Sequence, residues 1–530
     1  TDNGLVWVYD SIGFGYEDNK EVDNTRKILL YSYHDLPYYP RLCLLHLSIY
    51  PEDYEIKKHT LIWKWVAEGY VHEELGKGLF EIGERYFNML IDRSMIQAVE
   101  KPYHSIIYAC RVHDLVLDMI HFLSNEKSFV NVLNSNRTLT SPHRLAIQNE
   151  VVELDRYVAN TSMQHVRSYN ATLCRFGMLP LLSNFKALRV LDLEDCTFIG
   201  RSCVKPEDSP FHLKHLGRLT HLRYLGLSSQ FWLWGPPFIE LPKEIGGLKF
   251  LQVLDLSRTC ILELPQSVGQ LTKLKCLRFD GPSMGVLDWT NLTSLEDLRL
   301  SRVSSDFLKE LGKLTELREF WITFDECDNM VFTDLMGSLG NLKKLQVIYV
   351  DQGSRHDKPW SSYEGSMNLG HLRHLILNSP FPGLPVWVNS SCLPKLCHLS
   401  MHLQATESHH MDIFGRFSEL VTLHIRSLDC IVFPGAMDED AFPKLRHLHL
   451  QYDVQPIFRR GAMPNLEFLR LSIKSWTSDV DFLIMETPYC YRAAAWTFLA
   501  WRTSLVLRKL MLTFILSLHW ESTCRNQMHR

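Results

Sequence analysis

The residues best suited to chemistry are His113 and Asp114, which open a predicted helix. Apolar side chains recur every three or four residues from Val112 to Leu123, which indicates one buried helical stripe. His113 and Asp114 fall in the first turn and off this stripe. The start of a helix carries unpaired N–H groups and partial positive charge, so a phosphate would be favoured there. His113 would donate to that phosphate and Asp114 would fix the ring tautomer, although such a pair alone is more typical of a solvated helix start.

The overall composition limits what the chain can be. Its 530 residues exceed what one ordinary hydrophobic core supports, so at least two domains are expected. The net charge of −4 offers no electrostatic basis for binding nucleic acid. Thirteen scattered cysteines without a CxxC pair indicate free thiols in a reducing compartment, which predicts a cytoplasmic location. Neither GxxxxGKS nor GxxxxGKT occurs, so we expect no triphosphate cradle and no enzymatic activity in this chain.

The elements that position His113 form an expected winged-helix domain over residues 36–123. Proline disfavours helix at the residue before it, so Pro37 and Pro51 mark helix ends. Gly69 is the expected C-cap of the helix before it. The expected helices cover residues 25–36, 40–49, 57–68 and 78–92, and the hairpin strands cover residues 95–99 and 105–110.

DNA binding is an alternative for a winged helix. Such proteins place a helix rich in basic and amide side chains in the major groove. The candidate helix and its end carry three acidic and two basic residues, which are Glu81, Glu84, Asp92, Arg85 and Arg93. Phosphate would repel that face, so we do not expect nucleic-acid binding.

A second pattern, LxxLxL, fills most of the remaining chain from residue 166 to residue 480. It occurs twelve times at spacings of 21 to 34 residues, first at Leu188, Leu191 and Leu193. One such unit cannot bury its own leucines, whereas stacked units form one continuous core. The fold class is therefore α/β: a helical winged-helix domain followed by a leucine-rich repeat solenoid, a horseshoe with a parallel β-sheet.

The middle residue of each LxL should point away from the leucine core on the concave sheet, because strand side chains alternate. Aromatic anchors dominate binding energies, so Trp321 and Tyr349 are the leading candidates for partner contact, unless this column is ordinary solvated variation. The candidate partner-binding residues are Arg278, Arg299, Trp321, Tyr349, His424 and His449. Further histidines lie nearby, but no closed ligand set follows from their spacing, and we expect no metal.

Two segments do not fit either pattern. Residues 124–165 are polar and are expected to form a linker or a cap for the repeats. Residues 481–530 are an atypical apolar tail whose charge-free runs are shorter than the ~18 residues a membrane span needs. We attribute the tail to an altered reading frame or splice product, with an interfacial helix or a poorly packed terminus as alternatives.

The winged-helix region carries a specific family resemblance. Residues 43–56, CLLHLSIYPEDYEI, and residues 61–71, LIWKWVAEGYV, resemble plant nucleotide-binding leucine-rich-repeat disease-resistance proteins, most closely the coiled-coil class. In that family the winged helix ends at a Met-His-Asp motif. The corresponding residues here are Val112, His113 and Asp114, with valine in place of methionine. Because the chain begins at Thr1, we interpret it as the C-terminal part of such a protein, with residues 1–35 ending the upstream nucleotide-binding module.

The resemblance implies a role for each part. His113 would contact the β-phosphate of ADP in the resting state with Asp114 as its partner, and ADP or ATP would bind only in the full-length protein. The repeats would recognise a pathogen effector or a guarded host protein and hold the switch closed. Upstream nucleotide-binding and coiled-coil domains would act in cis, and activation would bring oligomerisation, a defense response and hypersensitive cell death.

Two other functions remain open. A leucine-rich-repeat substrate receptor of a ubiquitin ligase would need an F-box-like helical adaptor, which residues 36–123 match less well. A secreted receptor ectodomain is disfavoured by the winged helix and the unpaired cysteines.

Overall fold

The computed structural model describes the chain from residue 20 to residue 486 with internal gaps. The gaps are residues 101–105, 134–141, 150, 153–162, 177–181, 199–212, 214, 229–239, 260, 283, 285–286, 304, 325–328, 353–366, 368, 405–406, 428–430, 433–439, 452–453, 456–462 and 475–478. Most of the predicted apolar tail, residues 487–530, lies outside the described residues. Within the described part, none of the helices has the length and apolar character that crossing a membrane requires.

The first domain has the expected winged-helix arrangement. Its strands form a small antiparallel sheet in the order β1-β3-β2. Gly69 ends α4 in the left-handed conformation at φ 82°, as the sequence predicts. The elements are α2 (Lys20–Asp35), α3 (Tyr38–His46), the 3-10 helix η1 (Leu47–Ile49), β1 (Ile56–Lys57), α4 (Lys58–Glu68), α5 (Leu79–Asp92), β2 (Gln97–Glu100), β3 (Ile107–Arg111) and α6 (Asp114–Glu126).

The repeats form one sheet of 16 strands, in which neighbouring strands are parallel until the last pair. Its strands are β4 (Asn131–Leu133), β5 (Arg144–Gln148), β7 (Ser168–Thr172), β9 (Val190–Asp192), β11 (Tyr224–Gly226), β12 (Val253–Leu256), β13 (Cys276–Phe279), β14 (Asp297–Ser301), β15 (Glu319–Phe324), β16 (Val347–Gln352), β17 (His374–Phe381), β18 (His398–Leu403), β19 (Thr422–Ser427), β21 (His447–Gln451), β23 (Phe468–Lys474) and β24 (Asp479–Glu486). The repeat leucines are buried in a single cluster along its length, which confirms the predicted solenoid.

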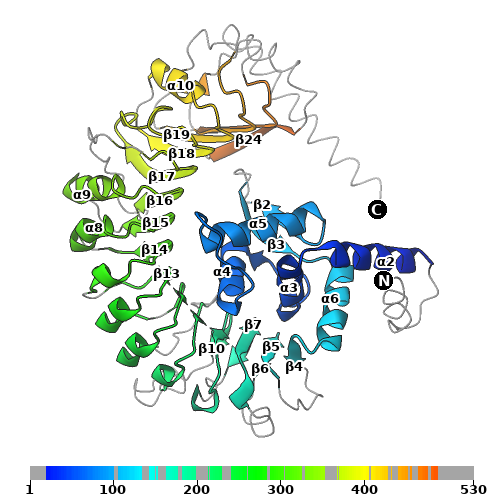
Figure 1. Cartoon of the computed structure of the whole chain (residues 1–530). Coiled ribbons are helices and arrows are strands. Elements are labelled where there is room, and N and C mark those ends of the chain that lie inside the picture. The colour runs from blue at the N-terminus through cyan, green and yellow to red at the C-terminus, as the bar shows by residue number, and fades with distance from the viewer. Residues whose placement is uncertain are drawn as a thin grey trace.

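Short helices and strands complete the outer side of the horseshoe, and the sheet curves around the winged helix (Figure 1). The outer helices are η2 (Met163–His165), η3 (Leu182–Asn184), η5 (Leu216–Arg218), η6 (Lys243–Gly247), η7 (Gln266–Gln270), η8 (Trp289–Asn291), α8 (Ser305–Leu311), α9 (Asn329–Leu339) and α10 (Ser408–Gly415). The short strands β6 (Val151–Val152), β8 (Arg175–Phe176) and β10 (Thr197–Phe198) form a second sheet, and β20 (Ile431–Val432) pairs with β22 (Val454–Gln455).

The sheet is longer at both ends than the repeat pattern indicates. Residues 124–165, expected as a linker or cap, continue α6 and then contribute β4 and β5 to the main sheet. At the other end, β24 crosses the expected boundary at residue 480 and pairs antiparallel with β23. Edge strands expose unpaired backbone groups, and in the described residues β5 and β24 pair with the edges that β7 and β23 would otherwise expose.

Candidate functional site at the winged-helix and repeat interface

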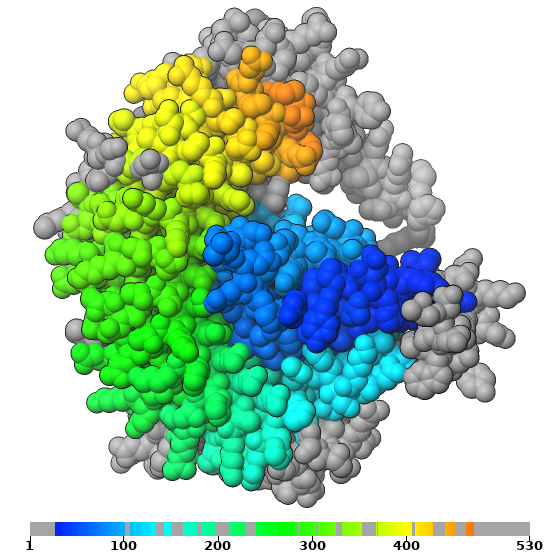
Figure 2. Space-filling view, viewed as in Figure 1, coloured from blue at the N-terminus to red at the C-terminus, as the bar shows by residue number. Residues whose placement is uncertain are grey.

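Helix α4 is buried on both of its faces. Eight consecutive residues, Thr60 to Ala67, are buried, although a surface helix normally buries one stripe. Leu61 and Trp65 lie on one stripe of α4 and pack in the core of the winged helix. Trp63 and Lys64, which lie off this stripe, contact side chains of the repeat sheet. The helix is therefore enclosed between its own domain and the concave sheet, where Figure 2 shows the blue domain seated directly against the green repeats.

An apolar column on the concave sheet receives the winged helix. The column lies two residues before the middle of each LxL, so it points to the same face as the column identified from sequence. Its first four members join the winged-helix core cluster rather than the leucine core. They are Val190, Tyr224, Val253 and Cys276, each no more than 1% exposed. Burial of these side chains stabilises docking because apolar surface leaves water.

Lys64 is the centre of a buried ion network within this interface. Its Nζ lies 2.5 Å from Oδ2 of Asp192 and 2.8 Å from Oε2 of Glu194, and it donates to the hydroxyl of Tyr50 at 2.7 Å. Burial alone would lower the pKa of Lys64, but the two carboxylates raise it well above its ordinary value. The lysine is therefore charged, and a buried charge of this kind is costly to leave unpaired.

The two carboxylates around Lys64 differ in their proton affinity. Burial and the neighbouring Glu194 raise the pKa of Asp192 to about 7, although Lys64 opposes this. Burial also acts to raise the pKa of Glu194, but Lys64 and Lys57 lower it below its usual value. Within the network, Asp192 therefore holds a proton more readily than Glu194 does.

A third carboxylate, Asp195, lies three residues after β9 and extends the network to the first strand of the winged helix. Asp195 accepts a hydrogen bond from the Tyr54 hydroxyl at 2.8 Å. Lys57 lies 3.4 Å and Arg258 lies 3.1 Å from its carboxylate oxygens. One carboxylate thus joins side chains from the winged helix and from a later repeat turn.

A second polar cluster forms where α4 faces β13 and β14. The Trp63 indole N–H donates to Oδ2 of Asp297 at 3.0 Å, and Arg278 contacts the same oxygen at 2.7 Å. Arg278 also lies 3.5 Å from Asp255 on β12. Glu319 on β15 is the register partner of Asp297. Burial and the Asp297 charge raise the pKa of Glu319 to about 8.

Polar pairs continue the interface towards both sides. Arg318 pairs with Glu81 of α5 at 3.4 Å. At the other side, Glu68 of α4 pairs with Arg144 of β5 at 3.1 Å and accepts a hydrogen bond from Ser168 of β7. These contacts of the winged helix with strands β5 to β15, together with the apolar column, are called the docking interface below.

The predicted concave residues divide between this interface and the rest of the sheet. Arg278 is only 5% exposed, and its charge is used by Asp255 and Asp297 within the chain. The sequence reasoning named this residue but missed the apolar column beside it and the acids at the end of β9. Two sequence features could have indicated this interface. One is the four apolar residues on the strand face that points away from the leucine core, and the other is Trp63 on the face of α4 opposite Leu61 and Trp65.

The next predicted residues form an aromatic ladder across adjacent strands. The Arg299 guanidinium lies 4.2 Å from the ring centroid of Trp321, which stacks on Tyr349 at 4.5 Å and 19°. Further along, His424 stacks on His449 at 4.2 Å and 7°. The parallel register places each pair directly side by side, as the LxL alignment predicts. No observation here tests whether a partner binds them, so that role stays a prediction.

The predicted phosphate-binding pair lies outside the docking interface. His113 is the exposed N-cap of α6, and its Nδ1 accepts a hydrogen bond from the Leu115 amide at 3.3 Å. Among the described residues, this amide rather than Asp114 holds the ring. A ring that accepts at Nδ1 carries its proton on Nε2, which leaves that atom to donate to an anion at the helix start.

Comparison with known proteins agrees with both domains. A family model of the leucine-rich repeat region matches residues 165–489, and a model of the disease resistance protein winged helix domain matches residues 49–120. Among solved structures, a TDR receptor superposes with a TM-score of 0.41 at 17% identity, covering 67% of this chain and 62% of that chain.

Two plant relatives extend the match across the boundary between the domains. Disease resistance RPP13-like protein 4 of Arabidopsis thaliana is 30% identical over 400 residues, covering 72% of this chain and 44% of that protein. Disease resistance protein RGA5 of Oryza sativa subsp. japonica is 26% identical over 470 residues, covering 85% of this chain and 40% of that protein. The chain thus spans less than half the length of these relatives. With its winged helix and its repeats both matched, the chain belongs to the leucine-rich repeat family of plant disease resistance proteins.

Proposed function

We propose that this chain is the regulatory and sensing part of a plant immune receptor, in which the docking interface holds the winged helix in a resting position. The observation that supports this most directly is Lys64, a winged-helix cation that is 0% exposed and paired with two carboxylates of the repeats. A buried pair of this kind costs several kcal/mol to break on one side, so the two domains separate only when something compensates. The winged helix and repeats act as interaction modules, and no catalytic step is assigned to them.

The half-buried aromatic ladder at the edge of the docking interface is the proposed recognition surface. Arg299, Trp321 and Tyr349 present a rigid stacked surface next to the docking interface, and aromatic and arginine side chains carry much of the energy of protein interfaces. A pathogen effector or guarded host protein that binds there and extends onto the docking interface would favour the undocked state. A ligand shifts such an equilibrium only by its different affinity for the two states.

A charge reversal across the interface tests the resting role. In the full-length receptor expressed in leaf tissue, Glu81→Arg or Arg318→Glu alone should place like charges together and cause cell death without an effector. The double variant restores an opposite-charge pair and should return the receptor towards silence. Lys344→Glu, which breaks an exposed pair with Glu316 away from the interface, is the matched control. If both single variants accumulate to normal protein levels and neither causes cell death, the proposal is contradicted.

ADP is proposed as the ligand of the full-length receptor, bound in part through His113 and Asp114. Asp114→Val should weaken ADP retention and favour the active state, because Asp114 is expected to orient His113 when ADP is bound, whereas the Leu115 amide holds the ring in this structure. A loss of about 1.4 kcal/mol in ADP contact would shift the balance between states about tenfold. The measurement is nucleotide content of the purified receptor together with cell death. A variant that accumulates normally, retains ADP like the wild type and causes no cell death would reject this role. We also propose that the receptor is cytoplasmic.

A further inference from the structure

Three metal-ligating side chains meet where α4 crosses β14 and β15. His59 comes from the first turn of α4, whereas Asp297 and Glu319 open two adjacent strands and are register partners. Nδ1 of His59 lies 3.4 Å from Oε2 of Glu319 and 3.8 Å from Oδ2 of Asp297. One ligand atom of each residue lies within 4.8 Å of the other two. The three side chains belong to both domains, so a ligand shared by them would join the domains directly.

Several atoms of this group have unused bonding capacity although they are buried. Within the described residues, Oδ1 of Asp297 has no hydrogen-bond partner, and Nδ1 of His59 and Oε2 of Glu319 have none although they face each other at 3.4 Å. The Asp297 side chain is only 3% exposed, and its other oxygen is held by Trp63 and Arg278. Buried polar atoms are normally satisfied, so these three atoms are available to a bound ligand.

The surroundings leave room for an ion and a water molecule. All three side chains line a cavity of about 240 Å³ between the winged helix and the repeats. The ring of His59 is packed on Phe80 with centroids 4.8 Å apart, and Asp297 is oriented by donors from Trp63, Arg278 and Cys276. Such outer contacts fix the geometry of metal ligands. The cavity is lined by both charge signs: Lys57, Lys58, Arg278, Arg299, Arg318 and Arg373 oppose a cation, whereas Glu81, Glu84, Glu296, Asp297 and Glu319 favour one. Arg278, the cation in contact with Asp297, is also paired with Asp255 at 3.5 Å, which offsets part of its charge.

We propose that His59, Asp297 and Glu319 bind a divalent transition-metal ion, best matched by Zn²⁺, which clamps α4 to the repeats. Tetrahedral zinc with ligand bonds of about 2.0–2.1 Å places its ligand atoms about 3.3 Å apart. Here the His59 nitrogen lies 3.4 Å from the Glu319 oxygen and 3.8 Å from the nearer Asp297 oxygen, so a small adjustment brings the three atoms to that spacing. One imidazole and two carboxylates suit zinc, and the cavity supplies space for a water as fourth ligand. The inference rests on the interface geometry alone and does not depend on the proposed immune function.

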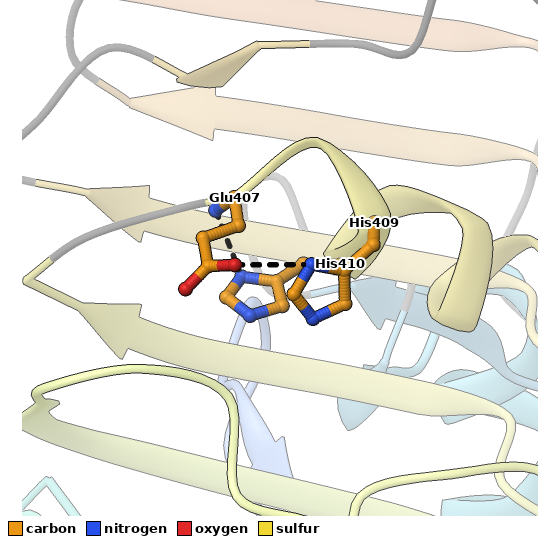
Figure 3. A group of neighbouring side chains, drawn as sticks. All are labelled: Glu407, His409 and His410. Carbon is orange, nitrogen blue, oxygen red and sulfur yellow. Dashed lines mark hydrogen bonds and ion pairs between the residues drawn. The ribbon is translucent and has the colours of Figure 1, made fainter.

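A second group with similar ligand types provides a matched control. Glu407, His409 and His410 meet at the start of α10 on the outer surface (Figure 3). Here Nδ1 of His410 accepts a hydrogen bond from the Glu407 amide at 3.1 Å, so this imidazole nitrogen is already used in helix capping. Glu407 and His409 are largely exposed, at 70% and 58%. We therefore expect weak zinc binding there at most.

The test uses the full chain after chelator treatment, titrated with ZnCl₂ by calorimetry and by melting temperature. The wild-type chain and His409→Ala should bind one Zn²⁺ with the same affinity, and zinc should raise their melting temperatures. His59→Ala and Glu319→Gln should each weaken this binding at least tenfold and abolish the rise. Cobalt(II) should give the intense visible absorption of a four-coordinate site in the wild type and lose it in Glu319→Gln.

Either of two results would overturn the proposal. One is that the wild type binds no Zn²⁺ at micromolar concentration. The other is that His409→Ala removes the binding while His59→Ala or Glu319→Gln keeps it, which places the ion on the outer surface. Glu319→Gln preserves side-chain size, so it decides the result if circular dichroism shows that His59→Ala is unfolded.

Discussion

The two halves of the concave sheet share one backbone geometry but differ in what faces outward. In the half from β9 to β13, one outward column is apolar and buried against the winged helix, while acids beside it pair with α4. From β17 onwards the same column carries His374, His398, Thr422 and His447. The middle residues of the LxL units form the neighbouring column. This column carries Asp192 on β9 and the Arg299–Trp321–Tyr349 ladder on β14 to β16. The repeat pattern thus fixes where side chains point, and their chemistry decides which half receives the winged helix.

This contrast separates two kinds of stabilisation in one molecule. The leucine core follows from the local repeat and is the same in both halves. The docking interface depends on residues distant in sequence, such as Lys64 and Glu194, 130 positions apart. Changes in the outward columns should therefore affect docking far more in one half than in the other.

The largest difference is expected for a carboxylate placed in the same column of each half. Val253→Asp buries an unpaired charge under the winged helix and should destabilise docking by several kcal/mol. His447→Asp, at the equivalent strand position, is only half-buried and should cost much less. Hydrogen exchange of the α4 amides reports docking in both variants. Equal exchange rates would remove the distinction between the two halves.

The second expected difference is between a buried and an exposed ion pair. Lys64→Met leaves Asp192 and Glu194 without their cation and should cost about 3–5 kcal/mol. Lys344→Met breaks an exposed 2.6 Å pair with Glu316 and should cost less than about 1 kcal/mol. Chemical denaturation followed by tryptophan fluorescence measures both. A loss below about 1 kcal/mol for Lys64→Met would show that the buried network contributes little.

The third difference is a pH dependence centred on His46, which is fully buried beside Glu68 in the winged helix. Burial lowers the pKa of His46 from 6.5 to about 4. Between these values the unfolded chain binds a proton that the folded chain does not, so stability is lost as pH falls from about 6.5 to about 4. The full shift corresponds to about 3 kcal/mol. His46→Gln should reduce this pH dependence, measured as melting temperature against pH.

His447 is the comparison residue for this titration. Burial lowers its pKa too, but the group is half-buried and Glu467 opposes the shift. His447→Gln should therefore change the pH profile less than His46→Gln does. The same profile in wild type and His46→Gln would show that another group controls acid unfolding.

Much of the fold was predictable because it depends on local periodicity. The winged-helix stripe, the Gly69 cap and the LxxLxL leucines are confirmed, since each follows from a spacing that the backbone imposes. The end strands β4, β5 and β24 were not predicted as repeat strands, because they join the sheet without its leucine pattern. The partner-binding and ADP-binding roles remain predictions.

The candidate site was only half predictable. The sequence located the outward column containing Arg278 and Trp321, because alternation in a strand is a local rule. It did not show that Arg278 is covered or that His59, Asp297 and Glu319 meet, because these contacts join segments more than 230 residues apart. By itself, then, the sequence determined the elements, the leucine core and the direction of each side chain. Tertiary structure alone decided which outward residues meet the winged helix, since that depends on the curvature of the whole sheet around α4.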